Sequence, residues 1–109
     1  QMCIRDRGGS GEGVNPEQLF AAGYAACYHS ALKAVAKDKD VDVTDSAVGA
    51  RVTLNNGSEG FFISAELEVT IPGVEQEEAQ ALADAAHEVC PYSKATRGNI
   101  DVTVTVAQD

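Results

Sequence analysis

The chain of 109 residues is long enough for one small domain, and its 44% hydrophobic and 23% charged content is typical of a globular protein. Its formal net charge of −9 disfavours binding to nucleic acids or anionic membranes, because both attract basic surfaces. Three cysteines are too few for a secreted disulfide framework, and no apolar run approaches the ~20 residues that cross a bilayer, so a cytoplasmic protein is expected.

Residues 1–13 are interpreted as a segment apart from the domain. Gln1–Arg7 has no clear periodicity and joins abruptly to the glycine-rich stretch Gly8–Gly13, which is typical of a flexible lead-in. The first seven residues are therefore interpreted as foreign sequence, with a genuine flexible arm as the alternative, and Cys3 is set aside with them. The domain itself is expected over residues 14–109.

A first helix is predicted from Pro16 to about Lys37. Asn15 offers an N-cap, Pro16 suits the first helical position, and Gln18 stands where a capping-box partner belongs. The segment is rich in alanine and almost uncharged after Glu17. A helix that is apolar nearly all round is typically buried.

An antiparallel hairpin is predicted next. Apolar residues alternate with polar ones over residues 48–54, Asn55–Gly60 has the composition of a turn, and the alternation resumes over residues 61–71. This pattern indicates one buried face and one face in water. The apolar face of the return strand would comprise Phe61, Ile63, Ala65, Leu67, Val69 and Ile71.

A second helix is predicted from near Glu75, with an apolar stripe that ends at Cys90 and places this cysteine on the core-facing side. Pro91 is expected to stop or bend the helix. The polar segment Tyr92–Asn99 then leads to a last strand over residues 100–106. The expected fold class is α+β, with two helices packed on a mainly antiparallel sheet.

Cys27 and Cys90 are the candidate reactive residues, and they lie too far apart in the sequence for a CxxC redox motif. A thiolate can attack a peroxide to give an alcohol and a sulfenic acid, and a second thiol can condense with the sulfenic acid to form a disulfide. Cys27 lies in the middle of its helix, so a cation from elsewhere would have to lower its pKa. The alternative for each cysteine alone is a small buried hydrophobic residue.

Three neighbours of Cys27 on the same predicted helix are candidate site residues. Phe20 and Tyr24 lie near its face and would give an organic peroxide an apolar pocket, with ordinary core packing as the alternative. Glu17 lies ten residues before Cys27, which is about 15 Å along a straight helix. It could therefore serve the thiol only if the chain bends or a second subunit supplies it, and a stabiliser of the helix dipole is the alternative.

The segments NPEQLFAAGYAAC (residues 15–27) and CPYSKATRGNI (residues 90–100) closely resemble the signatures of the organic hydroperoxide resistance proteins. These proteins form a branch of the OsmC-like superfamily of thiol peroxidases, which act in the response to oxidative stress. The resemblance implies an OsmC-like fold and an intertwined homodimer with active sites at the subunit interface. It also implies that Cys27 is the peroxidatic cysteine, that Cys90 is the resolving cysteine, and that Glu17 positions an arginine beside the peroxidatic thiol.

The same resemblance implies fatty-acid and other organic hydroperoxides as substrates and a dihydrolipoyl group on a protein as the reductant, with no bound metal, haem or flavin. The family's activating arginine precedes the glycine-rich stretch, and neither Arg5 nor Arg7 matches it in context. The chain is therefore predicted to lack its N-terminal strands and to be poorly active as it stands. Arg97, within the second motif, is predicted to have a structural role near the turn.

Other classes of function remain as alternatives. A zinc module could use Cys27, His29, His87 and Cys90, but residues two apart on a helix point about 200° away from each other, and His87 with Cys90 supplies only two ligands. A detoxifying protein with another electrophile as its substrate is a second alternative, and a cysteine nucleophile with a histidine base would be the acyl-transfer version of it. A non-catalytic OsmC-like binding or structural domain, or an inactive fragment, is the remaining alternative.

Overall fold

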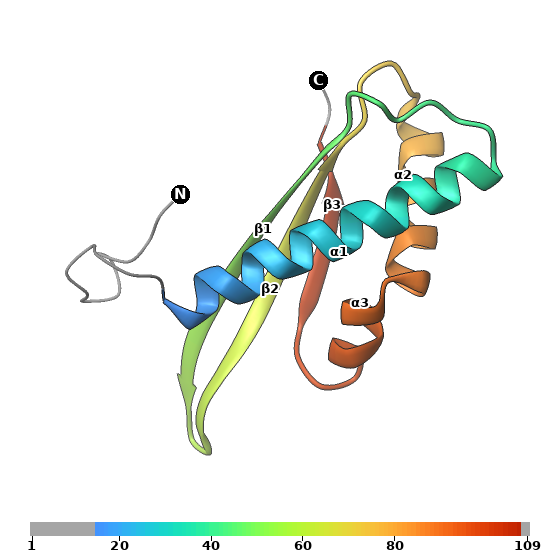
Figure 1. Ribbon diagram of the computed structural model, residues 1–109. Coiled ribbons are helices and arrows are strands. Elements are labelled where there is room, and N and C mark those ends of the chain that lie inside the picture. The colour runs from blue at the N-terminus through green and yellow to red at the C-terminus, as the bar shows by residue number, and fades with distance from the viewer. Residues whose placement is uncertain (1–14, 108–109) are drawn as a thin grey trace.

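The computed structural model describes residues 15–107, and these residues form three helices and three strands (Figure 1). The predicted N-terminal segment 1–13 lies outside the described residues. The elements, in chain order, are α1 (Pro16–Asp38), β1 (Ala47–Gly57), β2 (Gly60–Thr70), α2 (Gln76–Val89), α3 (Pro91–Thr96) and β3 (Val102–Val106).

The strands form one mixed sheet in the order β1-β2-β3. β1 pairs antiparallel with β2 from Ala47↔Thr70 to Gly57↔Gly60, whereas β3 pairs parallel with the second half of β2. The parallel pairing needs a long crossover, which α2 and α3 provide. The predicted α+β class and the mainly antiparallel sheet are confirmed.

α1 begins where its capping residues predict. Asn15 Oδ1 accepts a hydrogen bond from the Gln18 backbone N–H at 2.7 Å, and Pro16 occupies the first helical position. Only one face of α1 is buried, with Tyr24 and Leu32 fully enclosed, whereas Leu19 on the opposite face is 58% exposed. The expectation of burial all round is therefore wrong for the single chain, because the sheet and α2 cover α1 from one side only.

The β1–β2 hairpin is longer than predicted. The strands continue to Gly57 and resume at Gly60, so most of the predicted turn Asn55–Gly60 belongs to the ladder, and Gly60 has a φ of +111° that suits glycine. The end of the hairpin extends past the helices (Figure 1), which leaves Phe61 71% exposed. The predicted buried face of β2 therefore starts at Ala65 rather than at Phe61.

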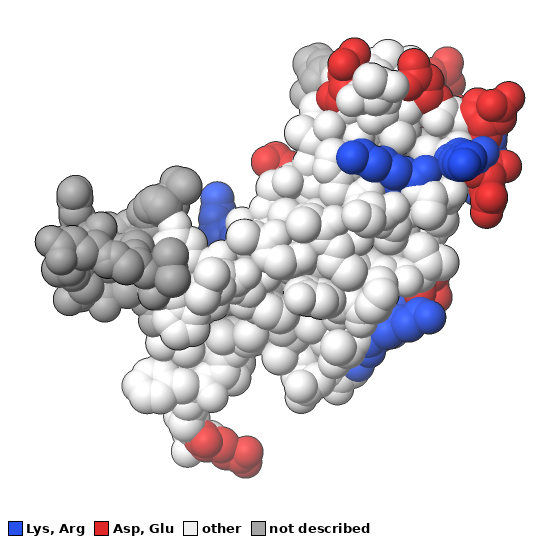
Figure 2. Space-filling view, viewed as in Figure 1, with Lys and Arg blue, Asp and Glu red and all other residues white. Residues whose placement is uncertain are grey.

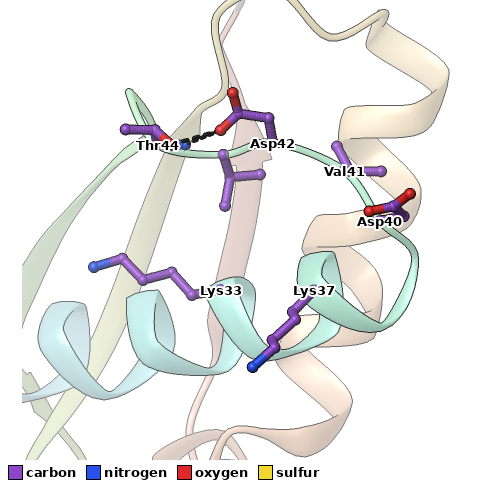
Figure 3. Close-up of a pocket in the computed structure, with 7 residues that line it drawn as sticks. Lys33, Lys37, Asp40, Val41, Asp42 and Thr44 are labelled. Atoms are coloured by element: carbon purple, nitrogen blue, oxygen red, sulfur yellow. Dashed lines mark hydrogen bonds between the residues drawn. The ribbon is translucent and has the colours of Figure 1, made fainter.

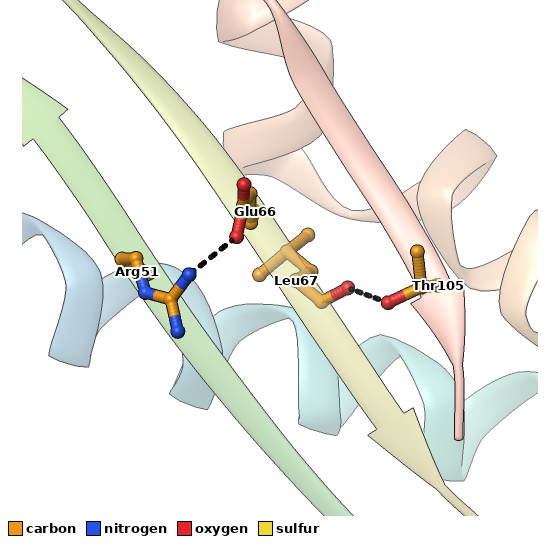
Figure 4. A network of polar contacts seen from close by, with 4 residues as sticks. All are labelled: Arg51, Glu66, Leu67 and Thr105. Carbon is orange, nitrogen blue, oxygen red and sulfur yellow. Dashed lines mark hydrogen bonds and ion pairs between the residues drawn. The ribbon is translucent and has the colours of Figure 1, made fainter. Parts of the chain in front are cut away.

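The core lies between the helices and the inner face of the sheet. Ala65, Leu67 and Val69 of β2 are buried, while Glu66 and Glu68 between them are exposed. On this outer, polar face Arg51 Nη1 and Glu66 Oε1 form an ion pair at 3.0 Å, and Thr105 Oγ1 donates to the Leu67 carbonyl at 3.5 Å (Figure 4). The side chains of the ion pair are 76% and 63% exposed, so it contributes little to stability.

A third helix, α3, occupies the segment that was predicted to be an irregular polar connection. Pro91 starts it immediately after Cys90, which is both the C-cap of α2 and the N-cap of α3. The prediction of two helices is therefore wrong. The six residues of α3 have no apolar stripe, because the side chains that they bury are the hydroxyls of Ser93 and Thr96.

The surface that α1 crosses is largely uncharged in its middle, and charged side chains gather where α1 ends (Figure 2). Within residues 15–107 no helix combines the length and hydropathy that spanning a membrane requires.

Candidate active site

The fold brings Cys27 of α1 and Cys90 of the α2–α3 junction together. The Cys90 thiol donates to Cys27 Sγ at a sulfur–sulfur distance of 3.5 Å, and both cysteines are free. Cys90 is completely buried, whereas Cys27 is half-buried. A disulfide has an S–S length of about 2.05 Å, so the two sulfur atoms need to approach by only about 1.5 Å to bond.

Backbone hydrogen bonds fix the position of Cys90 from both sides. Its N–H donates to the Ala86 carbonyl at 2.9 Å, which completes α2, and its carbonyl accepts from the Lys94 N–H at 3.0 Å, which begins α3. The extended backbone of Cys90, with φ −66° and ψ 124°, makes the bend between the two helices. Pro91 therefore does not merely stop α2: it starts a new helix with Cys90 at the corner.

The surroundings of Cys27 act on the pKa of its thiol in opposite directions. Burial raises this pKa above its ordinary value, and the neighbouring Cys90 raises it further. The backbone N–H of Tyr92 donates to Cys27, which lowers the pKa but does not offset the burial. None of the groups of residues 15–107 that move this pKa is a cation. The described residues thus give the Cys27 sulfur two hydrogen-bond donors, the Tyr92 N–H and the Cys90 thiol, and no opposite charge.

Three aromatic rings form a cluster on the segments that carry the two thiols. Phe20 stacks on Tyr92 with ring centroids 6.0 Å apart and an interplanar angle of 11°. Tyr24 meets both rings edge-on, at 5.7 Å from Phe20 and 5.9 Å from Tyr92. Tyr24 is fully buried, so Phe20 and Tyr92 form the solvent side of this cluster. Phe20 is partly buried, and Tyr92 is 40% exposed. Sequence reasoning placed Phe20 and Tyr24 near Cys27 but did not select Tyr92, although it directly follows Cys90-Pro91.

The close packing of Tyr92 depends on a glycine in α1. A Cβ atom at Gly23 would lie 3.3 Å from Tyr92 Cε2 and 3.4 Å from the Tyr92 hydroxyl oxygen. The Tyr92 ring therefore lies directly on the backbone of α1, one turn before Cys27. Only glycine leaves this contact unstrained.

A buried hydroxyl network connects α1 to the Cys90 turn, which is the corner where α2 ends at Cys90 and α3 begins. The Tyr24 hydroxyl contacts Ser93 Oγ at 2.9 Å and Thr96 Oγ1 at 3.1 Å, and Ser93 Oγ contacts His87 Nδ1 at 2.7 Å. Arg97 Nη2 donates to the His87 carbonyl at 2.7 Å, so its predicted structural role near the turn is confirmed. Burial and the Arg97 charge lower the pKa of His87, against the weaker opposite effect of the nearby carboxylates.

Glu17 lies in the first turn of α1, and α1 continues unbroken past Cys27 (Figure 1). Ten residues of continuous helix separate the two side chains by about 15 Å. The structure thus brings together Cys27, Cys90, Phe20 and Tyr24, but it does not bring Glu17 to the thiol of its own chain.

A cavity that no cysteine lines lies between the end of α1 and the loop that follows it. It has a volume of about 560 Å³, and Lys33 and Lys37 face Asp42 and Thr44 across it (Figure 3). Asp42 Oδ1 accepts hydrogen bonds from both the backbone N–H and the hydroxyl of Thr44, which lower the pKa of its carboxyl. In residues 15–107 no three His, Cys, Asp or Glu side chains are placed to hold a metal ion, and His29 instead contacts Ser46 Oγ at 2.9 Å.

The family model described as OsmC-like protein matches residues 9–105 of this sequence. The chain belongs to the OsmC-like family. Within this family it is 52% identical over 105 residues to the organic hydroperoxide resistance protein of Xanthomonas axonopodis pv. citri, a match that covers 94% of this chain and 74% of the relative. It is also 52% identical over 92 residues to the organic hydroperoxide resistance protein OhrB of Bacillus subtilis, with 83% and 67% covered.

Solved structures of OsmC-like proteins confirm the expected fold. A crystal structure of an organic hydroperoxide resistance protein from Legionella pneumophila superimposes with a TM-score of 0.88 at 48% identity, over 95% of this chain and 77% of that one. The OhrB structure from Bacillus subtilis gives a TM-score of 0.85 at 47% identity, over 94% and 75%. The resemblance of the two sequence motifs to the organic hydroperoxide resistance branch is thereby confirmed, and the homodimer stays a prediction.

Proposed function

We propose that this chain is a thiol-dependent peroxidase that reduces organic hydroperoxides to alcohols. The observation that carries the proposal is the 3.5 Å separation of the two free thiols, Cys27 and Cys90. Organic hydroperoxide resistance proteins that share about half of its sequence support the choice of substrate class.

In the first step, the Cys27 thiolate attacks the terminal oxygen of the hydroperoxide. The O–O bond breaks, the alkoxide leaves and takes up a proton to become the alcohol, and Cys27 becomes a sulfenic acid. Two electrons pass from the sulfur to the peroxide. Phe20 and Tyr92 provide apolar surface for the organic part of the substrate, and the buried ring of Tyr24 supports both of them from behind. The Tyr92 N–H stabilises the thiolate before the attack.

In the second step, the Cys90 sulfur attacks Cys27 Sγ. The S–O bond breaks, hydroxide leaves and takes the proton of the Cys90 thiol to form water, and an intramolecular disulfide remains. An external dithiol then reduces the disulfide by thiol–disulfide exchange and is itself oxidised to a disulfide. We propose a protein-bound dihydrolipoyl group as this reductant, fatty-acid hydroperoxides among the substrates, and the reducing cytoplasm as the compartment.

A second copy of this chain would complete the site. Glu17 is about 15 Å from the Cys27 of its own unbroken helix, so it can act near a thiol only across a subunit interface. The uncharged outer side of α1, where Leu19 is 58% exposed, supports burial of this helix against a partner (Figure 2). Glu17 would then lie near the partner's peroxidatic thiol, where the family resemblance implies an acidic residue that positions an arginine.

The direct test is consumption of cumene hydroperoxide with dihydrolipoamide as the reductant. The chain should reduce cumene hydroperoxide in preference to hydrogen peroxide, and Cys27→Ser should abolish the reaction. Turnover is expected to be slow at neutral pH, because the pKa of Cys27 is raised. If cumene hydroperoxide is not consumed even in a single turnover at high pH, the chain is the non-catalytic binding or structural domain instead.

A further inference from the structure

Four hydrogen bonds lie in series beside Cys90. They join His87 Nδ1 to Ser93 Oγ at 2.7 Å, Ser93 Oγ to the Tyr24 hydroxyl at 2.9 Å, the Tyr24 hydroxyl to Thr96 Oγ1 at 3.1 Å, and Thr96 Oγ1 to the Ser93 carbonyl at 3.2 Å. Tyr24 and Ser93 are fully buried and Thr96 is 7% exposed, so the three hydroxyls depend on one another for hydrogen bonds.

The number of available protons determines the direction of every bond in this series. The Ser93 carbonyl can only accept, so Thr96 donates its single hydroxyl proton there. Tyr24 must therefore donate to Thr96, and its oxygen accepts from Ser93. Ser93 has then used its own proton, which leaves His87 Nδ1 as the donor to Ser93. With one acceptor for each hydroxyl proton, no other arrangement makes all four hydrogen bonds.

We infer that His87 is a positioning residue for the resolving cysteine, Cys90. Its Nδ1–H is the first donor in the series of hydrogen bonds from His87 to Ser93, Tyr24 and Thr96. This series holds the Cys90 turn against α1, the helix that carries Cys27. The effect of His87 on disulfide formation rests on the proposed function, whereas the assignment of His87 Nδ1–H as the donor rests on the hydrogen bonds alone. The neutral imidazole is accordingly protonated at Nδ1 and unprotonated at Nε2.

The attachment lies one helical turn from the thiol pair on both sides. Tyr24 precedes Cys27 by one turn of α1, and Ser93 follows Cys90 within the first turn of α3. The hydroxyl contact between Tyr24 and Ser93 thus runs beside the sulfur contact and holds the same two backbones together. Arg97 adds a second link between these elements, because the hydrogen bond that it donates to the His87 carbonyl connects the end of α2 to the end of α3.

Loss of this attachment should act on the second chemical step more than on the first. Attack on the peroxide uses Cys27 and a substrate from solution, whereas disulfide formation needs Cys90 within bonding distance of Cys27. A misplacement of about 1 Å can slow a reaction between positioned groups about a hundredfold. The two steps can be separated by following sulfenic acid and disulfide independently.

The first experiment reads the protonation of the two histidines from the ¹⁵N shifts of their rings, at a pH above both imidazole pKa values. His87 should be the Nδ1–H tautomer. His29 is a matched control with the opposite expectation, because Ser46 gives its proton to the Val43 carbonyl at 2.7 Å and so accepts from His29 Nε2. An Nε2–H tautomer at His87 would overturn the inference.

The second experiment compares His87→Leu, which removes the donor, with His87→Asn, whose side-chain amide keeps an N–H near the Nδ1 position. After one equivalent of cumene hydroperoxide, His87→Leu should lengthen the lifetime of the Cys27 sulfenic acid about tenfold or more, and His87→Asn should change it less than about threefold. His29→Leu, which removes a similar contact elsewhere on α1, should behave as the unmodified chain. Equal slowing by His87→Leu and His87→Asn, or no slowing by His87→Leu, contradicts the inference.

Oxidation with diamide separates this inference from the proposed function. Diamide takes two electrons and two protons from a pair of neighbouring thiols, so it forms the Cys27–Cys90 disulfide without any peroxidase chemistry. His87→Leu should slow this reaction as well, and His87→Asn should restore it. If the unmodified chain reacts with diamide but not with cumene hydroperoxide, the proposed function fails, while the placement of Cys90 by His87 is still measured.

Discussion

Cys27 Sγ and Cys90 Sγ lie 3.5 Å apart, although the whole β1–β2 hairpin and α2 separate the two residues along the chain. The distance is longer than a disulfide and within the range of a thiol hydrogen bond. Cys90 is fully enclosed and Cys27 is half-buried, so only one of the two sulfurs can meet a molecule from solvent. In the proposed reaction, this asymmetry supports Cys27 as the attacking cysteine and Cys90 as the resolving one.

Substitution of the two cysteines should therefore have different consequences. Cys27→Ser should lower the rate of cumene hydroperoxide reduction by about a thousandfold or more, because the only accessible nucleophile of the pair is lost. Cys90→Ser should leave the first turnover intact and let the Cys27 sulfenic acid accumulate, where a dimedone probe can trap it. Peroxide-dependent dimedone labelling of Cys90 in the Cys27→Ser variant, or full multiple turnover by Cys90→Ser, would reverse the assignment.

The reactivity of Cys27 should increase with pH well beyond neutrality. Burial raises the pKa of the thiol, so the protonated form dominates below the ordinary thiol pKa and the thiolate fraction grows only as the pH passes above it. The pH–rate profile of alkylation of Cys27 by iodoacetamide, measured in Cys90→Ser, tests this prediction. A plateau reached below about pH 7 would instead reveal a cation from outside residues 15–107 beside the thiol.

Two tyrosines of α1 form a matched pair for testing the hydroxyl network. Both are fully buried, but Tyr24 bonds the Cys90 turn, whereas Tyr28 donates to the Ala83 carbonyl of α2 at 2.6 Å. Tyr24→Phe should destabilise the fold by about 1–3 kcal/mol, because it leaves buried hydroxyls without partners, and Tyr28→Phe by about 0.5–1.5 kcal/mol. Urea unfolding at a fixed protein concentration measures both.

Only Tyr24→Phe should also slow disulfide formation, since the Tyr28 hydroxyl donates to the Ala83 carbonyl of α2 and not to Ser93 or Thr96. If the two variants slow disulfide formation equally, general loss of stability rather than attachment of the turn explains the effect.

Gly23→Ala should separate helix stability from the packing of Tyr92. Alanine favours a helix interior over glycine by about 1 kcal/mol, whereas a misfitting methyl group in a packed region costs about 1–3 kcal/mol. Tyr92 is 40% exposed and can move outward, so the net change in the free energy of unfolding should stay within about 1 kcal/mol. The Michaelis constant for cumene hydroperoxide should nevertheless increase, because the Tyr92 ring must shift against Phe20 to make room for the methyl group.

Ala22→Gly is the control for this variant, because Ala22 is exposed on the neighbouring position of the same helix. It should cost about 1 kcal/mol of stability without changing the Michaelis constant. An unchanged Michaelis constant in Gly23→Ala would show that the position of Tyr92 does not affect substrate binding.

Local features of the structure could be predicted from the sequence because local residues determine them. Asn15 and Pro16 fix the start of α1 through a hydrogen bond and a backbone angle, and the alternation along β2 fixes which of its faces meets the core. The exposure of Phe61 could not be predicted in this way, because it depends on how far the helices extend over the hairpin.

The site could be predicted only in part, for a related reason. The motif resemblance paired Cys27 with Cys90, but spacing alone gives no distance between helices that are far apart in sequence. α3 and its contacts were missed because Ser93 and Thr96 are polar, and a polar pattern predicts solvent rather than a buried hydrogen-bond network. The donor role of His87 becomes visible only when every hydroxyl proton of that network is counted.

The central claim is that Cys27 and Cys90 form one redox unit, and the most direct measurement is the state of both thiols after one equivalent of cumene hydroperoxide. Thiol titration should show the loss of two thiols for each peroxide consumed, and peptide mapping under non-reducing conditions should find Cys27 bonded to Cys90 within a single chain. Peroxide that oxidises only one thiol of this pair, or a disulfide that joins Cys27 to any other cysteine, would contradict the account.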